Sequence, residues 1–72
     1  MQNEFQLNDS QIKVYKAIKE FYKNHGYSPS IRELQKICGY KSTSSVHNHL
    51  KKLEKAGYIE LNKNIPRAIR LL

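Results

Sequence analysis

The hydrophobic and polar positions along the chain predict three amphipathic helices followed by a short hairpin. In residues 14–22 the apolar side chains recur three or four residues apart, which is the spacing of one helix face. Asn8 is a good N-cap residue, and Gln11 stands at the third helical position, where a capping box needs a side chain that reaches back. Gly26 is suited to end a helix in the left-handed conformation. We therefore predict the first helix over residues 9–25.

A second, shorter helix is predicted over residues 31–37. Ser30 and Glu33 have the spacing of a complete capping box, in which each side chain accepts a hydrogen bond from the other residue's backbone N–H. Gly39 closes the segment after about two turns. Its buried face is expected to consist of Ile31, Leu34 and Ile37.

A third helix is predicted over residues 43–56, because apolar side chains again recur at helical spacing up to Gly57. Ser42 is its candidate N-cap. The tight, glycine-containing connection between the second and third helices is typical of a helix-turn-helix. The buried side of the third helix is expected to consist of Val46, Leu50 and Leu53.

After Gly57 the period of the pattern changes from about 3.6 residues to 2. Two alternating segments flank the turn-forming residues 62–66, and this arrangement predicts an antiparallel hairpin over residues 58–72. The side chains expected to face the helices are Ile59, Leu61, Ile69 and Leu71.

The 72 residues are enough for one domain, which we predict to be a mainly helical (α+β) winged helix-turn-helix spanning 1–72. Residues 1–6 are expected to form a loose N-terminal arm. So small a core leaves little room for a catalytic cavity, so an enzyme is not expected. Cys38 has no second cysteine to pair with, and no apolar run approaches the ~20 residues that span a membrane, which favours a cytoplasmic location.

The net charge indicates which partners the protein attracts. Thirteen Lys and Arg side chains against six Asp and Glu give +7, a charge that attracts polyanions such as nucleic acids. Residues 41–72 carry seven basic and two acidic side chains (+5), whereas residues 1–40 carry six and four (+2). We therefore expect a nucleic-acid face mainly in the second half of the chain.

The third helix presents a polar side opposite its apolar stripe. At ~100° per residue, Ser44, Asn48 and Lys55 lie within about 20° of the outward direction, and Lys51 lies about 40° from it. His47 lies on the flank. Small polar side chains thus precede lysines, as in a helix that enters the major groove N-terminus first. Asn48 and His47 can hydrogen-bond to base edges, whereas the lysines meet phosphates.

Further residues are placed to contact a DNA backbone. Ser42 and the free N–H groups of the first turn of the third helix can hold a phosphate. The tip of the hairpin extends the basic side of this helix, as a wing lying along the adjacent backbone or minor groove would. Backbone contacts are therefore predicted for Lys41, Thr43, Lys51, Lys55, Lys63, Asn64 and Arg67.

The sequence predicts no other chemistry. His47 and His49 lie about 200° apart on the helix, and no CxxC motif is present to complete a zinc site with Cys38. His49 is expected to be a partly buried structural residue, and Cys38 a small hydrophobic one. No nucleophile–base pair is recognisable, so we expect no catalytic residue, metal, cofactor or small-molecule ligand.

Four stretches of the sequence resemble the N-terminal DNA-binding domain of LexA repressors in order and spacing. They are residues 26–34, 39–50, 53–59 and 66–72, and the similarity covers about residues 7–72. It implies a winged helix-turn-helix that binds a palindromic double-stranded DNA operator, on which two copies could pair as a homodimer. The base-proximal residues that it implies are Ser42, Ser44, Ser45, His47 and Asn48, with Ser30 and Arg32 at the backbone.

The resemblance makes a LexA-like transcriptional repressor the expected function, with polymerase blocked sterically by the bound protein. LexA repressors continue into a self-cleaving peptidase domain that these 72 residues do not contain, so autoproteolysis is not expected of them. The chain is either the isolated domain of a longer repressor or a stand-alone protein that reuses the module. The alternative function is a protein-interaction module that docks on a larger repressor or on a polymerase subunit.

Overall fold

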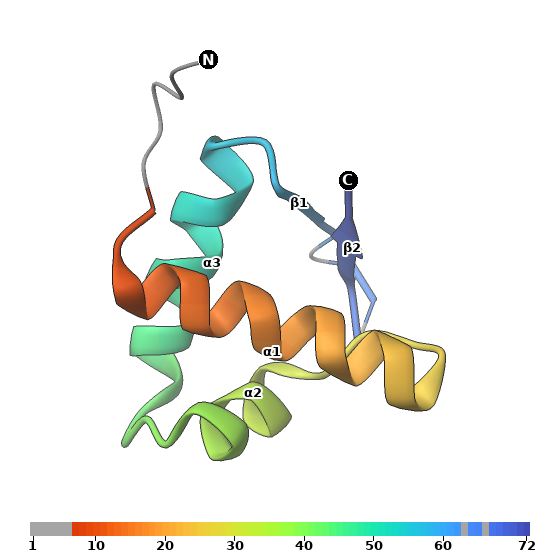
Figure 1. Ribbon diagram of the computed structural model, residues 1–72, viewed down its shortest axis with the longest axis horizontal. Helices are drawn as coiled ribbons and strands as arrows, with labels where there is room; N and C mark the ends of the chain where they lie inside the picture. Colours follow the sequence, from red (N-terminus) through yellow and green to blue (C-terminus); the bar gives the residue numbers. More distant parts are fainter. Residues whose placement is uncertain (1–6, 63, 66) are drawn as a thin grey trace.

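Three helices pack together and a two-stranded hairpin lies at one side of them (Figure 1). The computed structural model describes residues 7–62, 64–65 and 67–72. Its elements are α1 (Asp9–His25), α2 (Ile31–Cys38), α3 (Thr43–Lys55), β1 (Ile59–Leu61) and β2 (Ile69–Leu71). The prediction of a mainly helical winged helix-turn-helix is confirmed, with each helix boundary within one residue of its predicted place. The arm predicted over residues 1–6 lies outside the described residues.

The helix ends follow from local side-chain chemistry. Both predicted capping boxes are present: Asn8 with Gln11 at the start of α1, and Ser30 with Glu33 at the start of α2. Ser42 occupies the N-cap position of α3 but makes no side-chain capping hydrogen bond. The backbone N–H groups of the first turn of α3 therefore have no side-chain partner from Ser42.

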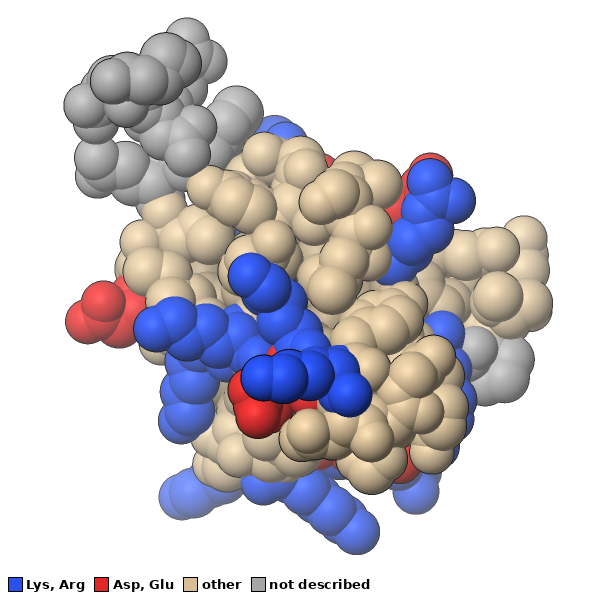
Figure 2. Space-filling view, turned by 45° about the vertical axis from the view of Figure 1, so that its right-hand side comes forward, with Lys and Arg blue, Asp and Glu red and all other residues tan. Residues whose placement is uncertain are grey.

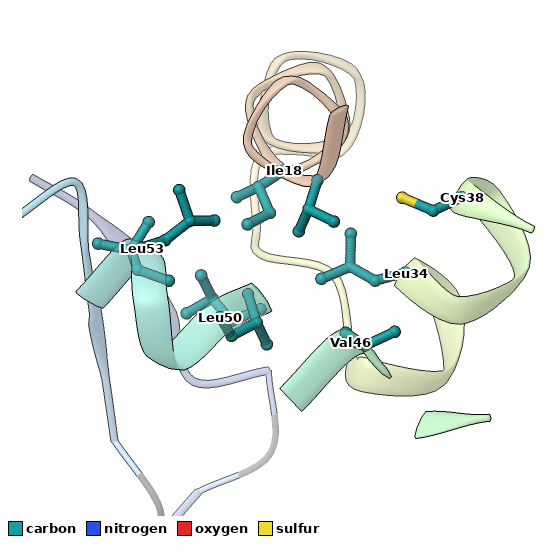
Figure 3. Packing of buried hydrophobic residues seen from close by; sticks show 9 residues of the cluster. Ile18, Leu34, Cys38, Val46, Leu50 and Leu53 are labelled. Carbon is teal, nitrogen blue, oxygen red and sulfur yellow. The ribbon is translucent and has the colours of Figure 1, made fainter. Parts of the chain in front are cut away.

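The core lies where the three helices meet the base of the hairpin. Figure 3 shows Ile18 pointing from α1 toward the side chains of α2 and α3. Val46, Leu50 and Leu53 are fully buried, so the predicted inner face of α3 is confirmed. Cys38 is buried among these side chains as predicted, and its burial raises the pKa of the thiol above the usual value.

One core prediction is wrong. Ile37 was expected on the buried face of α2, but its side chain is 52% exposed. Leu34 is fully buried, and Cys38 lies one helical turn after it, about 40° away, whereas Ile37 lies about 60° to the other side. Because α2 is only eight residues long, one turn carries its contact with the core, and Cys38 takes the inward place.

The hairpin rests on the helices through alternate side chains. β1 pairs antiparallel with β2, and Ile59 stands opposite Leu71 while Leu61 stands opposite Ile69. Ile59 and Ile69 are buried, and the two leucines are half-buried against the core, as the alternating pattern predicts. Between the strands, residues 63 and 66 lie outside the described part of the chain. Among the described residues, no helix combines the length and apolar character that crossing a membrane requires.

Candidate nucleic-acid interface

The outward side of α3 has the polar character that the helical period predicts. Ser44, His47, Asn48, Lys51 and Lys55 are all exposed. The opposite side of the same helix forms part of the core. Ser42 is also exposed, whereas Thr43 and Ser45 are half-buried. The structure therefore places most of the predicted base-proximal residues on one accessible surface.

A groove of about 640 Å³ separates α3 from the hairpin. His47 and Lys51 line its α3 side, and Asn62 and Ile65 line the hairpin side. Ser30 and Arg32, at the start of α2, also border it. The predicted contact residues that line this groove are Ser30, Arg32, His47, Lys51 and Arg67, whereas Ser42, Ser44, Ser45 and Asn48 are not among its lining residues.

The other residues predicted to contact a DNA backbone differ in their surroundings. Lys41 is exposed in the turn before α3. Asn64 is exposed, and its backbone N–H donates to the Asn62 side chain at 3.0 Å. Lys63 lies outside the described residues. Arg67 is exposed, with 40% of its side-chain surface accessible, but its guanidinium is turned toward the helices.

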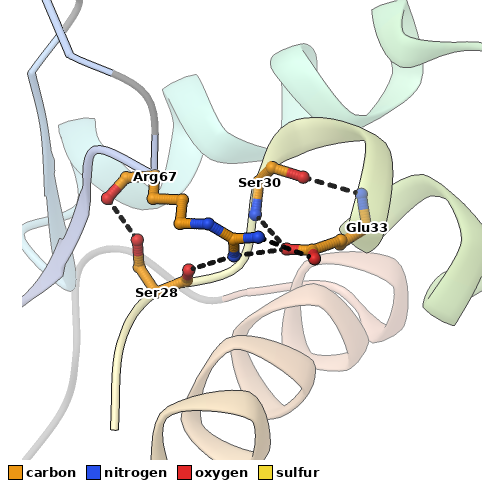
Figure 4. A network of polar contacts seen from close by, with 4 residues as sticks. All are labelled: Ser28, Ser30, Glu33 and Arg67. Atoms are coloured by element: carbon orange, nitrogen blue, oxygen red, sulfur yellow. Dashed lines mark hydrogen bonds and ion pairs between the residues drawn. The ribbon is translucent and has the colours of Figure 1, made fainter. Parts of the chain in front are cut away.

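Arg67 is bound to α2 and to the loop before it (Figure 4). Its guanidinium Nη1 and Nη2 donate to the two carboxylate oxygens of Glu33 at 2.7 and 3.0 Å. Nη1 also donates to the Ser28 carbonyl at 3.1 Å. The guanidinium lies 4.8 Å from the centre of the Tyr27 ring. This pair was missed at the sequence level, because nothing in the local pattern links residues 34 positions apart.

The same carboxylate also caps α2. Glu33 Oε1 accepts a hydrogen bond from the Ser30 N–H at 2.8 Å, and the Glu33 N–H donates to Ser30 Oγ at 3.1 Å. The hydrogen bonds from Arg67 and then from Ser30 lower the pKa of the Glu33 carboxyl from 4.5 to about 2, against a smaller opposing effect of desolvation. Glu33 is therefore ionised at neutral pH and serves both partners at once.

A pH-dependent contribution to stability follows from this shift. Because the pKa of Glu33 is lower in the folded protein, the stabilisation is fully present above the unfolded value of 4.5 and is lost as the pH falls toward 2. We expect wild type to need more urea for unfolding than Glu33→Gln near pH 7, and the difference to vanish near pH 2. Glutamine is a suitable reference because it retains the cap. A constant difference across this range would contradict an ionic Glu33–Arg67 pair.

His49 fits its predicted structural role. It is half-buried on the inner flank of α3, and its ring lies 5.3 Å from the ring of Tyr40. The Lys13 ammonium group, on α1, lies 5.8 Å from the centre of the Tyr40 ring. His49 Nδ1 is buried and has no hydrogen-bond partner among the described residues. In that part of the chain, no three His, Cys, Asp or Glu side chains are grouped to hold a metal ion.

Basic side chains dominate the surface charge. Figure 2 shows lysine and arginine side chains in the centre and along the lower edge of one face, with fewer acidic ones between them. Two ion pairs are formed among the described residues, Arg67 with Glu33 and Arg70 with Glu60. Lys41, Lys51 and Lys55 are thus exposed without an ion-pair partner in the described part of the chain.

A comparison against protein families agrees with the fold. The family described as "LexA DNA binding domain" matches residues 4–68, which is most of the chain. The chain belongs to this family. The LexA resemblance noted in the sequence is confirmed.

Full-length LexA repressors are similar to this chain over one part of their length. The LexA repressor of Clostridium novyi (strain NT) is 52% identical over 64 residues, which cover 89% of this chain and 31% of that protein. The LexA repressor of Acetivibrio thermocellus is 40% identical over 72 residues, covering 100% of this chain and 33% of that protein. The chain therefore spans about a third of the length of the curated relatives it matches.

Proposed function

We propose that this domain binds double-stranded DNA in a sequence-specific way and represses transcription, as a cytoplasmic regulator rather than an enzyme. The observation that carries the proposal is the exposed polar face of α3 beside a groove that leads to the hairpin. A helix fits the major groove of B-DNA, where each base pair presents a distinct pattern of donors and acceptors. The family match and the names of the LexA repressor relatives support the same function.

In this proposal α3 lies in the major groove with its N-terminal half against the bases. Asn48 and His47 hydrogen-bond to base edges, and the short side chains before them allow close approach. Lys51 and Lys55 meet phosphates farther along the helix. The proposed base-proximal set is Ser42, Ser44, Ser45, His47 and Asn48. The residues proposed to contact the DNA backbone are Ser30, Arg32, Lys41, Thr43, Lys51, Lys55, Lys63 and Asn64. Arg67, whose guanidinium is paired with Glu33, is not one of them.

We further propose that two copies bind a palindromic operator. A single small module makes few base contacts, and pairing on two half-sites increases affinity and defines a longer sequence. Repression would then result from steric exclusion of polymerase by the bound pair.

The proposed function is tested by selection from randomised duplexes. The purified chain is mixed with random double-stranded DNA at about 150 mM salt, where non-specific binding is weakened, and the retained duplexes are sequenced. We expect an enriched inverted repeat. Enrichment of one half-site would contradict paired binding but keep sequence-specific recognition. Retained DNA without enrichment would contradict specificity, and no retention would favour the protein-docking alternative.

A further inference from the structure

The hairpin is too short to be stable by itself, so its position depends on contacts with the rest of the domain. Each strand has three residues, and an isolated two-stranded hairpin of this size is at best marginally stable in water. Ile59 and Ile69 anchor its base in the core. The described residues between the two strands need other contacts if the wing is to keep a fixed distance from α3.

Hydrogen bonds tie both sides of the hairpin to the helices. On the outgoing side, the Leu61 N–H donates to Glu54 Oε2 of α3 at 3.2 Å. On the returning side, the contacts reach α1, the α1–α2 loop and α2. The Tyr22 hydroxyl on α1 donates to the Ile69 carbonyl at 2.7 Å. Ser28 Oγ, in the α1–α2 loop, donates to the Arg67 carbonyl. The Arg67 side chain then binds Glu33 in the first turn of α2. The returning side of the wing is thus held at Ile69 and at both the backbone and the side chain of Arg67.

The backbone of Arg67 has an unusual conformation, which is consistent with a hairpin held in a fixed position. Its φ is 53°, and it is the one described non-glycine residue with a positive φ. A side chain with a Cβ atom is disfavoured in this left-handed region. Such a conformation persists when the surrounding contacts determine it, and it is often found at functional sites. Here the surrounding contacts are those with Ser28, Glu33 and Tyr27.

The Glu33 carboxylate connects the start of α2 with the hairpin, the two elements that a DNA backbone in the groove would contact together. It caps α2, whose first residues border the groove, and it holds Arg67, which lines the same groove from the hairpin. We propose that the Glu33–Arg67 pair is a positioning device, which sets the wing at the distance from α3 that lets one DNA backbone lie in the groove. This inference rests on the proposed function. It gives Arg67 an indirect role, in place of the direct phosphate contact that the sequence predicts.

The two possible roles of Arg67 predict opposite effects of the substitution Glu33→Gln on DNA affinity. If Arg67 contacts a phosphate directly, Glu33→Gln releases the guanidinium and removes a negative charge, so that DNA affinity rises. If the pair positions the wing, Glu33→Gln lowers affinity for DNA that the wing reaches. In this variant Oε1 still accepts from the Ser30 N–H, but the amide NH₂ faces the Arg67 Nη2 donor. The cap is therefore kept while the pair is weakened.

The experiment compares two DNA duplexes at neutral pH. One is the duplex enriched by the selection. The other is a shorter version of it, designed from a hydroxyl-radical footprint of the wild-type protein. It lacks the part of the DNA backbone that is protected beyond the α3 contacts. The variants are Glu33→Gln and Arg67→Asn, since asparagine tolerates the left-handed backbone at this position. Arg70→Ala is the matched control. Arg70 is a second hairpin arginine, but it pairs with Glu60 across the strands at 3.4 Å, and both side chains are exposed.

We expect both variants to bind the full duplex about fivefold or more weakly than wild type, and the shortened duplex within about twofold of it. Arg70→Ala should change binding to both duplexes by the same factor, because it removes charge without releasing the wing. Higher affinity of Glu33→Gln for the full duplex would overturn the positioning role and support a direct phosphate contact by Arg67. An equal loss on both duplexes would also overturn it and indicate a purely structural pair. If wild type binds no duplex, the proposed function fails first.

Discussion

Ile18→Ala is expected to lower the free energy of unfolding by about 2–5 kcal/mol. Ile18 is fully buried and points from α1 into the space between α2 and α3 (Figure 3). The substitution removes buried methyl and methylene groups and leaves a cavity that the surrounding helices can close only in part. A domain of this size has a total stability of about 4–11 kcal/mol, so the loss is a large fraction of it. Thermal unfolding should show a melting temperature lowered by at least about 8 °C.

Ile37→Ala is the matched control for this prediction. It makes the same chemical change on a neighbouring helix, but at a side chain that is 52% exposed. We expect its effect on the free energy of unfolding to lie within about 0.5 kcal/mol. Neither residue belongs to the proposed DNA-binding set. Equal losses in the two variants would contradict the assignment of Ile18 to the core and of Ile37 to the surface.

Most of the fold could be predicted because its signals are local. The capping boxes of Asn8 with Gln11 and of Ser30 with Glu33 each lie within four residues, and both form in the structure. The change of hydrophobic period after Gly57 located the hairpin in the same way. Ile37 was wrongly predicted to be buried because the apolar face of the short helix α2 covers a wider arc than the part of the helix that contacts the core. Only the tertiary packing decides between two neighbouring apolar positions such as Ile37 and Cys38.

The features of the candidate site that depend on local signals could also be predicted, whereas those that depend on tertiary contacts could not. The outward face of α3 follows from the helical period once the buried stripe is known, and Asn48 and Lys51 are exposed as predicted. The surroundings of Arg67 could not be predicted, because its partner Glu33 is 34 residues away and belongs to another element. A sequence pattern reports the charge of such a side chain but not the direction in which it points. Arg67 therefore looked like a free cation at the wing.

Asn48→Ala is expected to weaken binding to the selected duplex by about 1–3 kcal/mol while leaving binding to random duplexes unchanged. Asn48 is exposed on the outward side of α3, and an asparagine amide can donate to and accept from one adenine edge in the major groove. Alanine removes both hydrogen bonds. It also has a higher helix propensity than asparagine, so loss of folding would not explain a loss of affinity. Titration of both duplexes at one salt concentration measures the difference.

Two further variants separate base recognition from charge and from helix content. Asn24→Ala makes the same change at an exposed position of α1, outside the proposed site, and should leave both affinities at the wild-type value. Lys51→Ala should weaken binding to selected and random duplexes alike and reduce the slope of log affinity against log salt by about 0.9, because a phosphate contact carries no sequence information. If Asn48→Ala behaved like Lys51→Ala, with equal losses on both duplexes, Asn48 would be a backbone contact. Sequence recognition by α3 would then have to depend on its neighbours His47 and Ser44.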